Sequence, residues 1–400
     1  MAQRTKRNLL LISLDTLRAD VAYGGHLRNF DSLCTQGTVF RNVVSSAPIT
    51  PVSHASVLTG LQPYQHGIRH LFKEQLSTSS PTLAQLMLAA GWQTGAIVSC
   101  PGLNKWYGMN IGFDHYDDEI PRLADGSDPL QTIDVKKRGT ALKRAPVVVE
   151  RGLRWLQSRR DQPFFLFLHF FDTHWPYEPP EWFAPAGVNP YEGEAHYIDH
   201  YLGQLFDQLT QWGLLEDTTV IIFSDHGEDL AGWYPNDHAG AGGEHPEEEG
   251  HGCLLYDATQ MVPLILIAPG LIPEKRSVDT QVRLVDIFPT VVDLFQLTDP
   301  SPRAGRSLRE LFHDSGENRV AYCETYYREE QSKAKDGVPG LGPWKALRIG
   351  NRYKVILDVN SRNLSVFDLI ADPHELHPVR FDELHGMTIG ELNSSATTTK

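Results

Sequence analysis

The sequence predicts an α/β protein with a large central, mostly parallel sheet flanked by helices, and with a smaller antiparallel sheet at the C-terminal end. Short, continuous apolar runs alternate with segments of helical spacing through most of the chain, and such runs are typical of parallel strands buried on both faces. From about Asn318 the pattern changes to short strands separated by turn residues. We therefore expect an α/β domain at residues 1–317, a small α+β subdomain at residues 318–392 and a disordered tail at residues 393–400.

The net charge of the chain argues against a partner that is duplex nucleic acid. The 400 residues include 36 Lys and Arg against 50 Asp and Glu, a formal net charge of -14. Proteins that bind duplex nucleic acid normally present a basic surface, so this balance argues against such a partner. A small anionic substrate remains compatible with it, because a metal ion and a few histidines reverse the field locally.

Neither a membrane segment nor a disulfide framework is indicated. No run reaches the roughly 18 apolar residues that span a bilayer. The apolar run Leu9–Leu14 is also too short for the core of a signal peptide, so we expect a cytoplasmic protein. The four cysteines include no CxxC pair, as expected for free, mostly buried thiols.

The first apolar run, Asn8 to Asp15, predicts a strand that ends in a carboxylate, at the edge where open α/β sheets bind ligands. Further along, Ser53–Leu58 is expected to begin a helix whose backbone N–H groups face an anion. Another interpretation is that Thr50 and Ser53 serve only as helix N-caps. Between these segments we expect a helix at Phe30–Gly37, after which Val39–Ser46 leads into the segment of Thr50.

Two later apolar runs also lead into acidic and imidazole side chains. Phe164–Phe171 has almost no polar residue, so it should lie at the centre of the sheet, and Asp172 and His174 follow it. Val220–Phe223 leads into Asp225-His226-Gly227.

The other expected elements are a helix at Ser80–Ala90 with Ser80 as N-cap and Pro81 at its first position, a strand at Thr94–Ser99, a surface excursion at Asp117–Arg144, helices at Pro146–Arg159 and Glu192–Trp212, a long polar loop at Asp229–Gly250, a strand at Val262–Ala268, a helix from Asp286, and C-terminal strands at Val320–Thr325, Tyr353–Leu357 and Ser365–Leu369.

Residues at these strand ends have the chemistry of a metal-assisted ester-cleaving site. Asp15, Asp225 and His226 supply two carboxylates and an imidazole, and Thr50 supplies a fourth oxygen. This set suits one hard or borderline divalent cation such as Zn²⁺, Mn²⁺, Ca²⁺ or Mg²⁺. The cation would lower the pKa of the threonine hydroxyl and make it a nucleophile. His174 and His251 would hydrogen-bond to the other ester oxygens or protonate the leaving group.

The motifs, taken together, resemble those of a known family. The chain resembles the sulfatase-like branch of the alkaline phosphatase superfamily over roughly residues 8 to 375. The segments that carry the resemblance are Leu14 through Asp20, Thr50 through Gly60 with Tyr64, His66 and Gly67, Asp172 through Tyr177, Tyr191 through His200, Phe223 through Glu228, His251 through Pro263, and Phe367-Asp368-Leu369 with Asp372-Pro373.

The resemblance implies the same fold and gives roles to matching positions. It implies metal ligands at Asp15, Asp225 and His226 and a nucleophile at Thr50. His54 falls where sulfatases carry an arginine that supports the nucleophile. His174 and His251 fall where the family contacts the transferred group.

The chain departs from ordinary sulfatases at the nucleophile. Sulfatases carry cysteine or serine at the position of Thr50, oxidised to formylglycine, whereas oxidation of a threonine would give a ketone. We therefore expect no formylglycine. Thr16 also replaces an acidic residue that often follows the first metal ligand. Threonine nucleophiles occur in the superfamily's nucleotide phosphodiesterases and in its phosphoethanolamine and phosphoglycerol transferases.

The sequence favours one function and leaves two alternatives open. The favoured function is hydrolysis of phosphate esters (as a phosphodiesterase or phosphatase) or phosphoryl transfer, through a covalent phosphothreonine. The alternatives are sulfate-ester hydrolysis by a route without formylglycine, and a non-catalytic homologue that keeps the metal. One metal ion is favoured, although Asp172 with His174 and His251 would suit a second. Further candidates for substrate contact are Arg18, His238 and His245. The sequence leaves the oligomeric state open.

Overall fold

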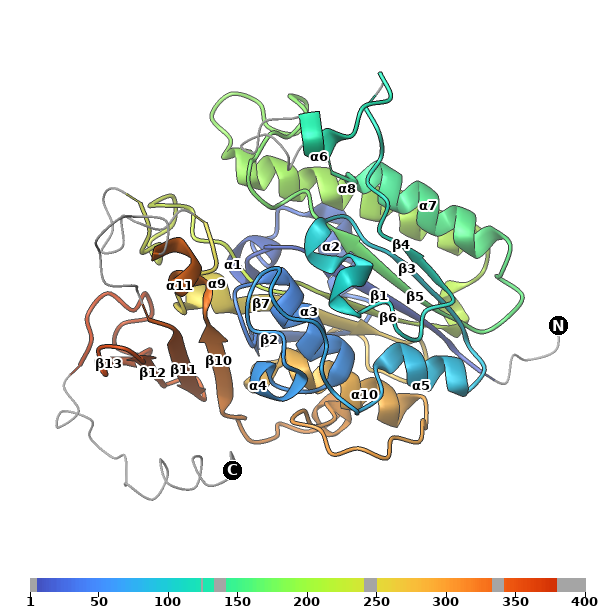
Figure 1. The fold of residues 1–400 in the computed structure, drawn as a ribbon. Helices are drawn as coiled ribbons and strands as arrows, with labels where there is room; N and C mark the ends of the chain where they lie inside the picture. Colours follow the sequence, from blue (N-terminus) through green and yellow to red (C-terminus); the bar gives the residue numbers. More distant parts are fainter. Residues whose placement is uncertain (1–5, 124, 133–141, 241–249, 333–341, 380–400) are drawn as a thin grey trace.

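The computed structural model describes residues 6–123, 125–132, 142–240, 250–332 and 342–379. A large sheet has the strand order β4-β3-β5-β1-β6-β7-β2-β8, with β9 paired to β2 (Figure 1). Its strands are β1 (Asn8–Leu14), β2 (Thr38–Val44), β3 (Gln93–Ile97), β4 (His115–Asp117), β5 (Phe164–Phe170), β6 (Thr218–Phe223), β7 (Met261–Ile267), β8 (Arg276–Val278) and β9 (Val282–Arg283). Of their pairings, only those of β7, with β6 and β2, are antiparallel, so the prediction of a mostly parallel sheet is confirmed.

The centre of the sheet consists of β5, β1 and β6, and every residue in these three strands is buried. The strands are parallel and in register, with Ser13 of β1 beside His169 of β5 and Phe223 of β6. Their carboxyl ends therefore meet at one edge of the sheet, as parallel strands require. Asp15 is the first residue after β1, and Asp225 is the second residue after β6. Both carboxylates therefore lie at this edge.

Helices cover both faces of the sheet. Since successive strand residues point to opposite faces, Leu9 and Leu11 belong to one hydrophobic core and Leu10, Ile12 and Leu14 to another. Figure 1 shows α7 and α8 together on one side of the sheet and α3, α5 and α10 on the other. The helices are α1 (Ala19–Ala22), α2 (Arg28–Cys34), α3 (Thr50–Thr59), α4 (Pro63–His66), α5 (Leu83–Ala89), α6 (Pro129–Thr132), α7 (Ala145–Gln157), α8 (Pro190–Gln211), α9 (Asp257–Gln260), α10 (Ile287–Leu294) and α11 (Tyr327–Ser332).

Helix α3 lies on the same face as Leu9 and Leu11 and is buried at all ten residues. Its N-cap is Ile49, which makes no side-chain capping bond, so the interpretation of Thr50 and Ser53 as N-caps is wrong. Thr50 is instead the first helical residue, and Gly60 ends the helix in the left-handed conformation at φ 65°. The packing of α3 thus directs Thr50 toward the sheet edge.

Two other expectations need correction. Helix α5 is capped by Thr82, whose side chain accepts from the backbone N–H of Gln85, and not by Ser80. The capping box with Gln85 explains the later start. The segment at Asp117–Arg144 is not a surface excursion throughout: Lys143 is fully buried, and its ammonium group bonds to Asp117 and to the carbonyl oxygen of Val98.

A second sheet of four antiparallel strands lies beside α9 and α11 (Figure 1), as predicted. It comprises β10 (Ala321–Thr325), β11 (Trp344–Ile349), β12 (Tyr353–Asp358) and β13 (Leu364–Asp368). Strand β11 was not predicted, because one of its three buried positions is an arginine, Arg348. The division at residue 317 stays a prediction, and the tail at 393–400 lies outside the described residues.

Short 3-10 turns complete the described elements. They lie at Pro101–Leu103, Lys105–Tyr107, Leu215–Asp217, Leu284–Asp286 and Arg309–Phe312. Within the described ranges no helix has the length and apolar character needed to cross a membrane. All four cysteines have free thiols, and three of them are buried.

Candidate active site

The four residues predicted to form the site meet at the carboxyl edge of the sheet. Thr50 Oγ1 lies 3.2 Å from Asp15 Oδ2 and 3.4 Å from His226 Nε2. Ligand atoms of Asp15, Asp225 and His226 all lie within 4.8 Å of one another. These three side chains are fully buried, and Thr50 is 6% exposed. Two strand ends and a helix start, from three separate parts of the chain, thus form one cluster.

The donor atoms of this cluster fit a divalent cation. Asp15 Oδ1 and Asp225 Oδ2 are buried and accept no hydrogen bond, which is costly for a carboxylate unless a cation compensates it. His226 Nδ1 lies 3.0 Å from the carbonyl oxygen of Gly227. Because a carbonyl oxygen can only accept, Nδ1 carries the hydrogen and Nε2 presents its lone pair to the carboxylates. Two orphan oxygens and one free imidazole nitrogen are suitable ligands.

Burial also raises the pKa of both carboxyl groups. For Asp15 the desolvation by burial is the largest cause, and for Asp225 burial is followed by the charge of Asp15. Two carboxylates so close together in a buried site repel each other. A bound cation would remove this repulsion and hold both groups ionised.

The backbone between Asp15 and Arg18 is held in an unusual conformation. Thr16 has φ 57°, in the left-handed region that a β-branched residue rarely adopts. Its N–H donates to Asp225 Oδ1 at 3.2 Å, and its carbonyl oxygen accepts from the Tyr191 hydroxyl at 2.8 Å. Such strain persists where surrounding contacts hold it, and it is concentrated at functional sites. Here it ties the end of β1 to the end of β6.

His54 lies behind Thr50, with both ring nitrogens close to protein atoms. It is fully buried, with Nδ1 2.8 Å from the carbonyl oxygen of Thr50 and Nε2 2.8 Å from Ser13 Oγ. Burial is the main cause that lowers its pKa to about 4. Both ring nitrogens thus have protein partners, and one of them is the backbone of Thr50; a catalytic or supporting role of His54 stays a prediction.

His174 and His251 lie on the partly exposed side of the cluster. Their rings are 4.7 Å apart, and the ring of His251 is 4.4 Å from that of His226. His174 Nδ1 donates to the carbonyl oxygen of Trp175 at 2.7 Å, which leaves Nε2 as an acceptor. Burial, followed by the neighbouring His251, lowers the pKa of His174 to about 3. Burial also holds the pKa of His251 well below its usual value.

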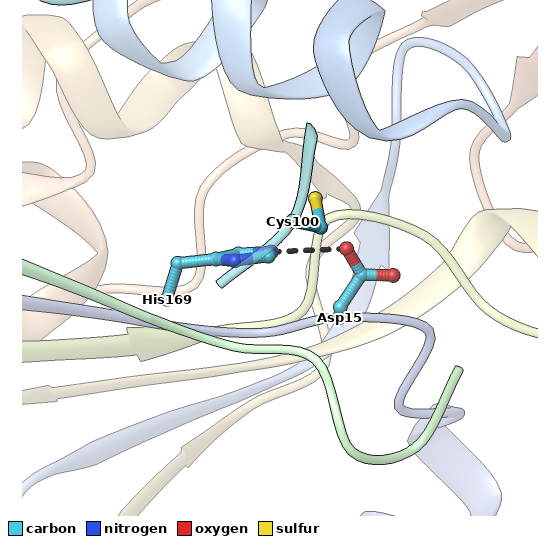
Figure 2. Close-up of side chains that lie close together, drawn as sticks. All are labelled: Asp15, Cys100 and His169. Atoms are coloured by element: carbon cyan, nitrogen blue, oxygen red, sulfur yellow. Dashed lines mark hydrogen bonds and ion pairs between the residues drawn. The ribbon is translucent and has the colours of Figure 1, made fainter. Parts of the chain in front are cut away.

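Two residues of the site were not singled out from the sequence. His169 Nε2 lies 2.9 Å from Asp15 Oδ2, and Figure 2 shows the ring of His169 directed toward Asp15, with Cys100 close to both residues. Ligand atoms of these three residues also lie within 4.8 Å of one another. Glu228 Oε1 lies 2.9 Å from His251 Nδ1 and burial raises the pKa of Glu228 to about 8. Each had a signal: His169 interrupts an apolar strand, and Glu228 follows Asp225-His226-Gly227.

Asp172 and Arg18 are committed to contacts inside the protein. Asp172 Oδ1 accepts from Arg144 Nε at 2.6 Å and from the N–H of Ala145 at 3.1 Å. Neither ligand group found among the described residues includes Asp172. The five N–H donors of Arg18 all have acceptors: two oxygens of Asp20, the carbonyl oxygen of Glu228, and side chains of Asn236 and Asp237. Arg18 therefore has no donor left for a substrate, and that prediction is corrected.

The two histidines predicted from the long polar loop are placed differently. His238 is 1% exposed, stacks on the ring of Tyr256 at 3.6 Å, and has Nε2 3.0 Å from the carbonyl oxygen of His374. It thus joins the loop to the C-terminal segment, and its contact with a substrate stays a prediction. His245 lies outside the described residues.

Comparison with known proteins identifies related sequences over most of the chain. A family model described as Sulfatase matches residues 7–297, and one described as N-sulphoglucosamine sulphohydrolase, C-terminal, matches residues 251–399. An arylsulfatase of Clostridium perfringens is 24% identical over 97% of this chain and 94% of its own length. A Delta 4,5-hexuronate-2-O-sulfatase of Bacteroides thetaiotaomicron is 23% identical over 96% of this chain and 87% of its own.

Solved structures share the fold at lower identity. One, solved in complex with its substrate D-glucosamine-2-N,6-O-disulfate, has a TM-score of 0.76 at 16% identity and covers 99% of this chain and 97% of its own. The phosphonate monoester hydrolase of Agrobacterium radiobacter has a TM-score of 0.75 at 19% identity, with 98% and 95% covered. At these identities the likeness concerns the fold.

Proposed function

The chain belongs to the sulfatase family and is a hydrolase acting on sulfuric or phosphoric ester bonds; within this class, we propose that it cleaves phosphate esters with Thr50 as nucleophile, through a covalent phosphothreonine. The observation that carries the proposal is the place of Thr50 Oγ1, 3.2 Å from Asp15 Oδ2 and 3.4 Å from His226 Nε2 at the first residue of α3. A hydroxyl between a proton acceptor and a cation site is an activated nucleophile.

The chemistry of threonine supports direct attack by the Thr50 hydroxyl over a formylglycine mechanism. A secondary alcohol would be oxidised to a ketone, so the hydroxyl itself must react. The hydroxyl of Thr50 donates to Asp15 Oδ2, which is the atom that can take up its proton. The N-terminus of α3 adds a favourable field for an anion at this position.

We propose one divalent cation (Zn²⁺, Mn²⁺, Ca²⁺ or Mg²⁺), held by Asp15, Asp225 and His226 with Thr50. When bound, it supplies positive charge that lowers the pKa of the Thr50 hydroxyl and polarises an ester oxygen. The ion pair between Asp172 Oδ1 and Arg144 Nε supports a single ion, because the guanidinium group already balances the charge of this carboxylate.

The reaction proceeds in two steps at the same phosphorus. Thr50 Oγ1 forms a bond to phosphorus while the bond to the leaving oxygen breaks, and water then cleaves the phosphothreonine. His174 and His251 are neutral in the free enzyme, because burial lowers the pKa of each. An anionic substrate favours their protonated forms, so the pair can donate to the leaving oxygen in the first step. A neutral Nε2 can accept the proton of the attacking water in the second. A second alcohol in place of water would make the reaction a phosphoryl transfer.

Sulfate-ester hydrolysis without formylglycine is the second candidate. The relatives named arylsulfatase and hexuronate sulfatase align with nearly the whole chain, and this favours a sulfuryl group. The same nucleophile and the same positive groups would act on it, since both transition states place charge on the transferred group's oxygens.

The deciding experiment is intact mass and peptide mapping after a brief, quenched reaction in the presence of each cation. The substrates are p-nitrophenyl phosphate, bis-p-nitrophenyl phosphate and p-nitrophenyl sulfate, with Thr50→Ala as the negative control and Thr50→Ser as the matched hydroxyl control. In the wild type and in Thr50→Ser we expect an adduct on residue 50, of phosphate size from the monoester and of p-nitrophenyl phosphate size from the diester.

Two results would overturn the proposal. Turnover of the sulfate alone would establish the second candidate. No turnover of any ester, with a cation bound, would leave a non-catalytic metal-binding homologue.

A further inference from the structure

We propose that His169 is a positioning residue: its Nε2–H orients Asp15 so that Asp15 Oδ1 faces the cation. The inference rests on the cation site of the proposed function and adds a residue that the family resemblance did not assign. It also decides between two interpretations of the group in Figure 2. In one, Asp15, Cys100 and His169 hold a second metal ion; in the other, His169 supports Asp15.

The strand register places His169 where it can reach Asp15. His169 of β5 lies beside Ser13 of β1, two residues before Asp15 and on the same face of the sheet. The side chains of His169 and Asp15 are fully buried, so no bulk water competes for their contact. Nε2 of His169 is 2.9 Å from Asp15 Oδ2.

The tautomer of His169 follows from its other contact. The backbone N–H of Ser99 lies 3.3 Å from His169 Nδ1. Because a backbone N–H can only donate, Nδ1 must accept, and the single hydrogen of the neutral ring is on Nε2. His169 therefore donates to Asp15 Oδ2 and offers no lone pair to a metal at that nitrogen. This favours support of Asp15 over ligation.

The two carboxylate oxygens of Asp15 differ in their hydrogen bonds. Oδ2 accepts from His169 and from the Thr50 hydroxyl. Oδ1 is buried and accepts nothing. A carboxylate fixed through one oxygen presents the other in a defined direction, and such supporting contacts typically change metal affinity 10–100-fold.

A matched control exists elsewhere in the chain. His66 is also fully buried; its Nδ1 accepts from the N–H of Ile68 at 3.2 Å, and its Nε2 lies 3.0 Å from Ser56 Oγ. The bonding pattern is the same, but its partner is a serine rather than a carboxylate of the site. Changes at His66 measure what loss of a buried histidine costs without a change at Asp15.

The test is the dissociation constant of Zn²⁺ and of Mn²⁺ for the full chain, measured by isothermal titration calorimetry. A glutamine at position 169 can keep an N–H near the place of Nε2, whereas asparagine and leucine cannot. We expect affinity within about threefold of wild type for His169→Gln, and a loss of roughly 10–100-fold for His169→Asn and His169→Leu. His66→Asn and His66→Leu should keep the wild-type affinity.

Distinct results would overturn distinct claims. Wild-type affinity in His169→Asn would overturn the positioning role alone. Two ions per chain, with one lost in Cys100→Ala, would make His169 a ligand. No cation binding by the wild type would overturn the proposed cation site, and the inference with it. If His169→Asn fails to fold, the ¹⁵N shifts of the wild-type imidazole decide: an Nδ1–H tautomer at His169 would contradict the proposal.

Discussion

Two clusters of buried charge differ in how their charges are balanced. The strand-end cluster (Asp15, Thr50, Asp225, His226) holds two carboxylates with one orphan oxygen each. The C-terminal cluster consists of two acids and two bases that pair with one another: Asp257, Arg348, Lys354 and Glu375.

The geometry of the C-terminal cluster explains why it needs no ion. Lys354 Nζ lies 2.8 Å from both Asp257 Oδ1 and Glu375 Oε1, and Arg348 lies 3.1 Å from Asp257 Oδ2. Burial would raise the pKa of Asp257, but the charges of Arg348 and Lys354 outweigh it and lower the pKa to about 2. In the strand-end cluster the carboxyl pKa values move upward instead. The pKa of Asp257 thus shifts opposite to those of Asp15 and Asp225 because Asp257 has two cationic partners, whereas the pKa of Glu375, which has only Lys354, shifts upward.

The largest effect expected in either cluster is on catalysis, at Thr50. Removal of the hydroxyl in Thr50→Ala should lower kcat by at least about 10⁴-fold, as expected when a covalent nucleophile is lost. The free energy of unfolding should change little, because Thr50 is the first helical residue and makes no cap. Steady-state kinetics and urea unfolding of the same preparations check both. Thr50→Ser, which keeps a hydroxyl, should retain turnover; equal loss in both variants would contradict a nucleophilic role.

The second prediction concerns the removal of one base from the C-terminal cluster. Lys354→Met leaves Glu375 without its cation and Asp257 with only Arg348, all within a largely buried region. Removing one partner of a buried ion pair typically costs about 3–5 kcal/mol of unfolding free energy. Cation affinity at the strand-end cluster should stay at the wild-type value. Urea unfolding and calorimetry measure the two quantities, and a stable Lys354→Met variant would show that the pairing is not needed.

The strand-end site was largely predictable because its members follow apolar runs. Asp15 and Asp225 end strands whose carboxyl edges must meet in a parallel sheet, so their proximity follows from the fold class alone. Thr50 came from the family motif and from the helix start after it. The resemblance to the sulfatase-like branch is confirmed, and it supplied the order of these segments.

The supporting residues were not predictable for a different reason. The role of His169 depends on strand register, which sets it beside Ser13, and on a hydrogen bond from Ser99 that fixes its tautomer. Neither fact can be read from residue types. Arg18 shows the opposite error: the sequence analysis named it as a candidate for substrate contact, but all its side-chain donors bind protein acceptors.

The third prediction concerns the binding of a cation to the strand-end cluster. A cation at about 100 times its Kd should raise the unfolding free energy of the wild type by about 2.7 kcal/mol. Asp225→Asn should abolish that gain. In the presence of a chelator the same variant should be as stable as the wild type or more so by about 1–2 kcal/mol, because a buried unpaired charge is removed. Thermal unfolding with and without the cation measures this, and a chelated Asp225→Asn that is less stable than wild type would contradict the distinction between the clusters.

The smallest effect of any single step is the change per pH unit that Glu375 gives to the stability of the C-terminal cluster. Burial, with the nearby charge of Asp257 and against that of Lys354, raises the pKa of Glu375 from 4.5 to about 7. Because the folded chain then holds a proton that the unfolded chain has released, the stabilisation is complete below pH 4.5 and is lost as the pH rises through about 7. The unfolding free energy should fall by at most about 1.4 kcal/mol per pH unit in that window. Glu375→Gln resembles the protonated carboxyl group, so it should match the wild type at the acidic end and lack this slope. Urea unfolding at several pH values checks this, and an unchanged slope in Glu375→Gln would assign the titration to another group.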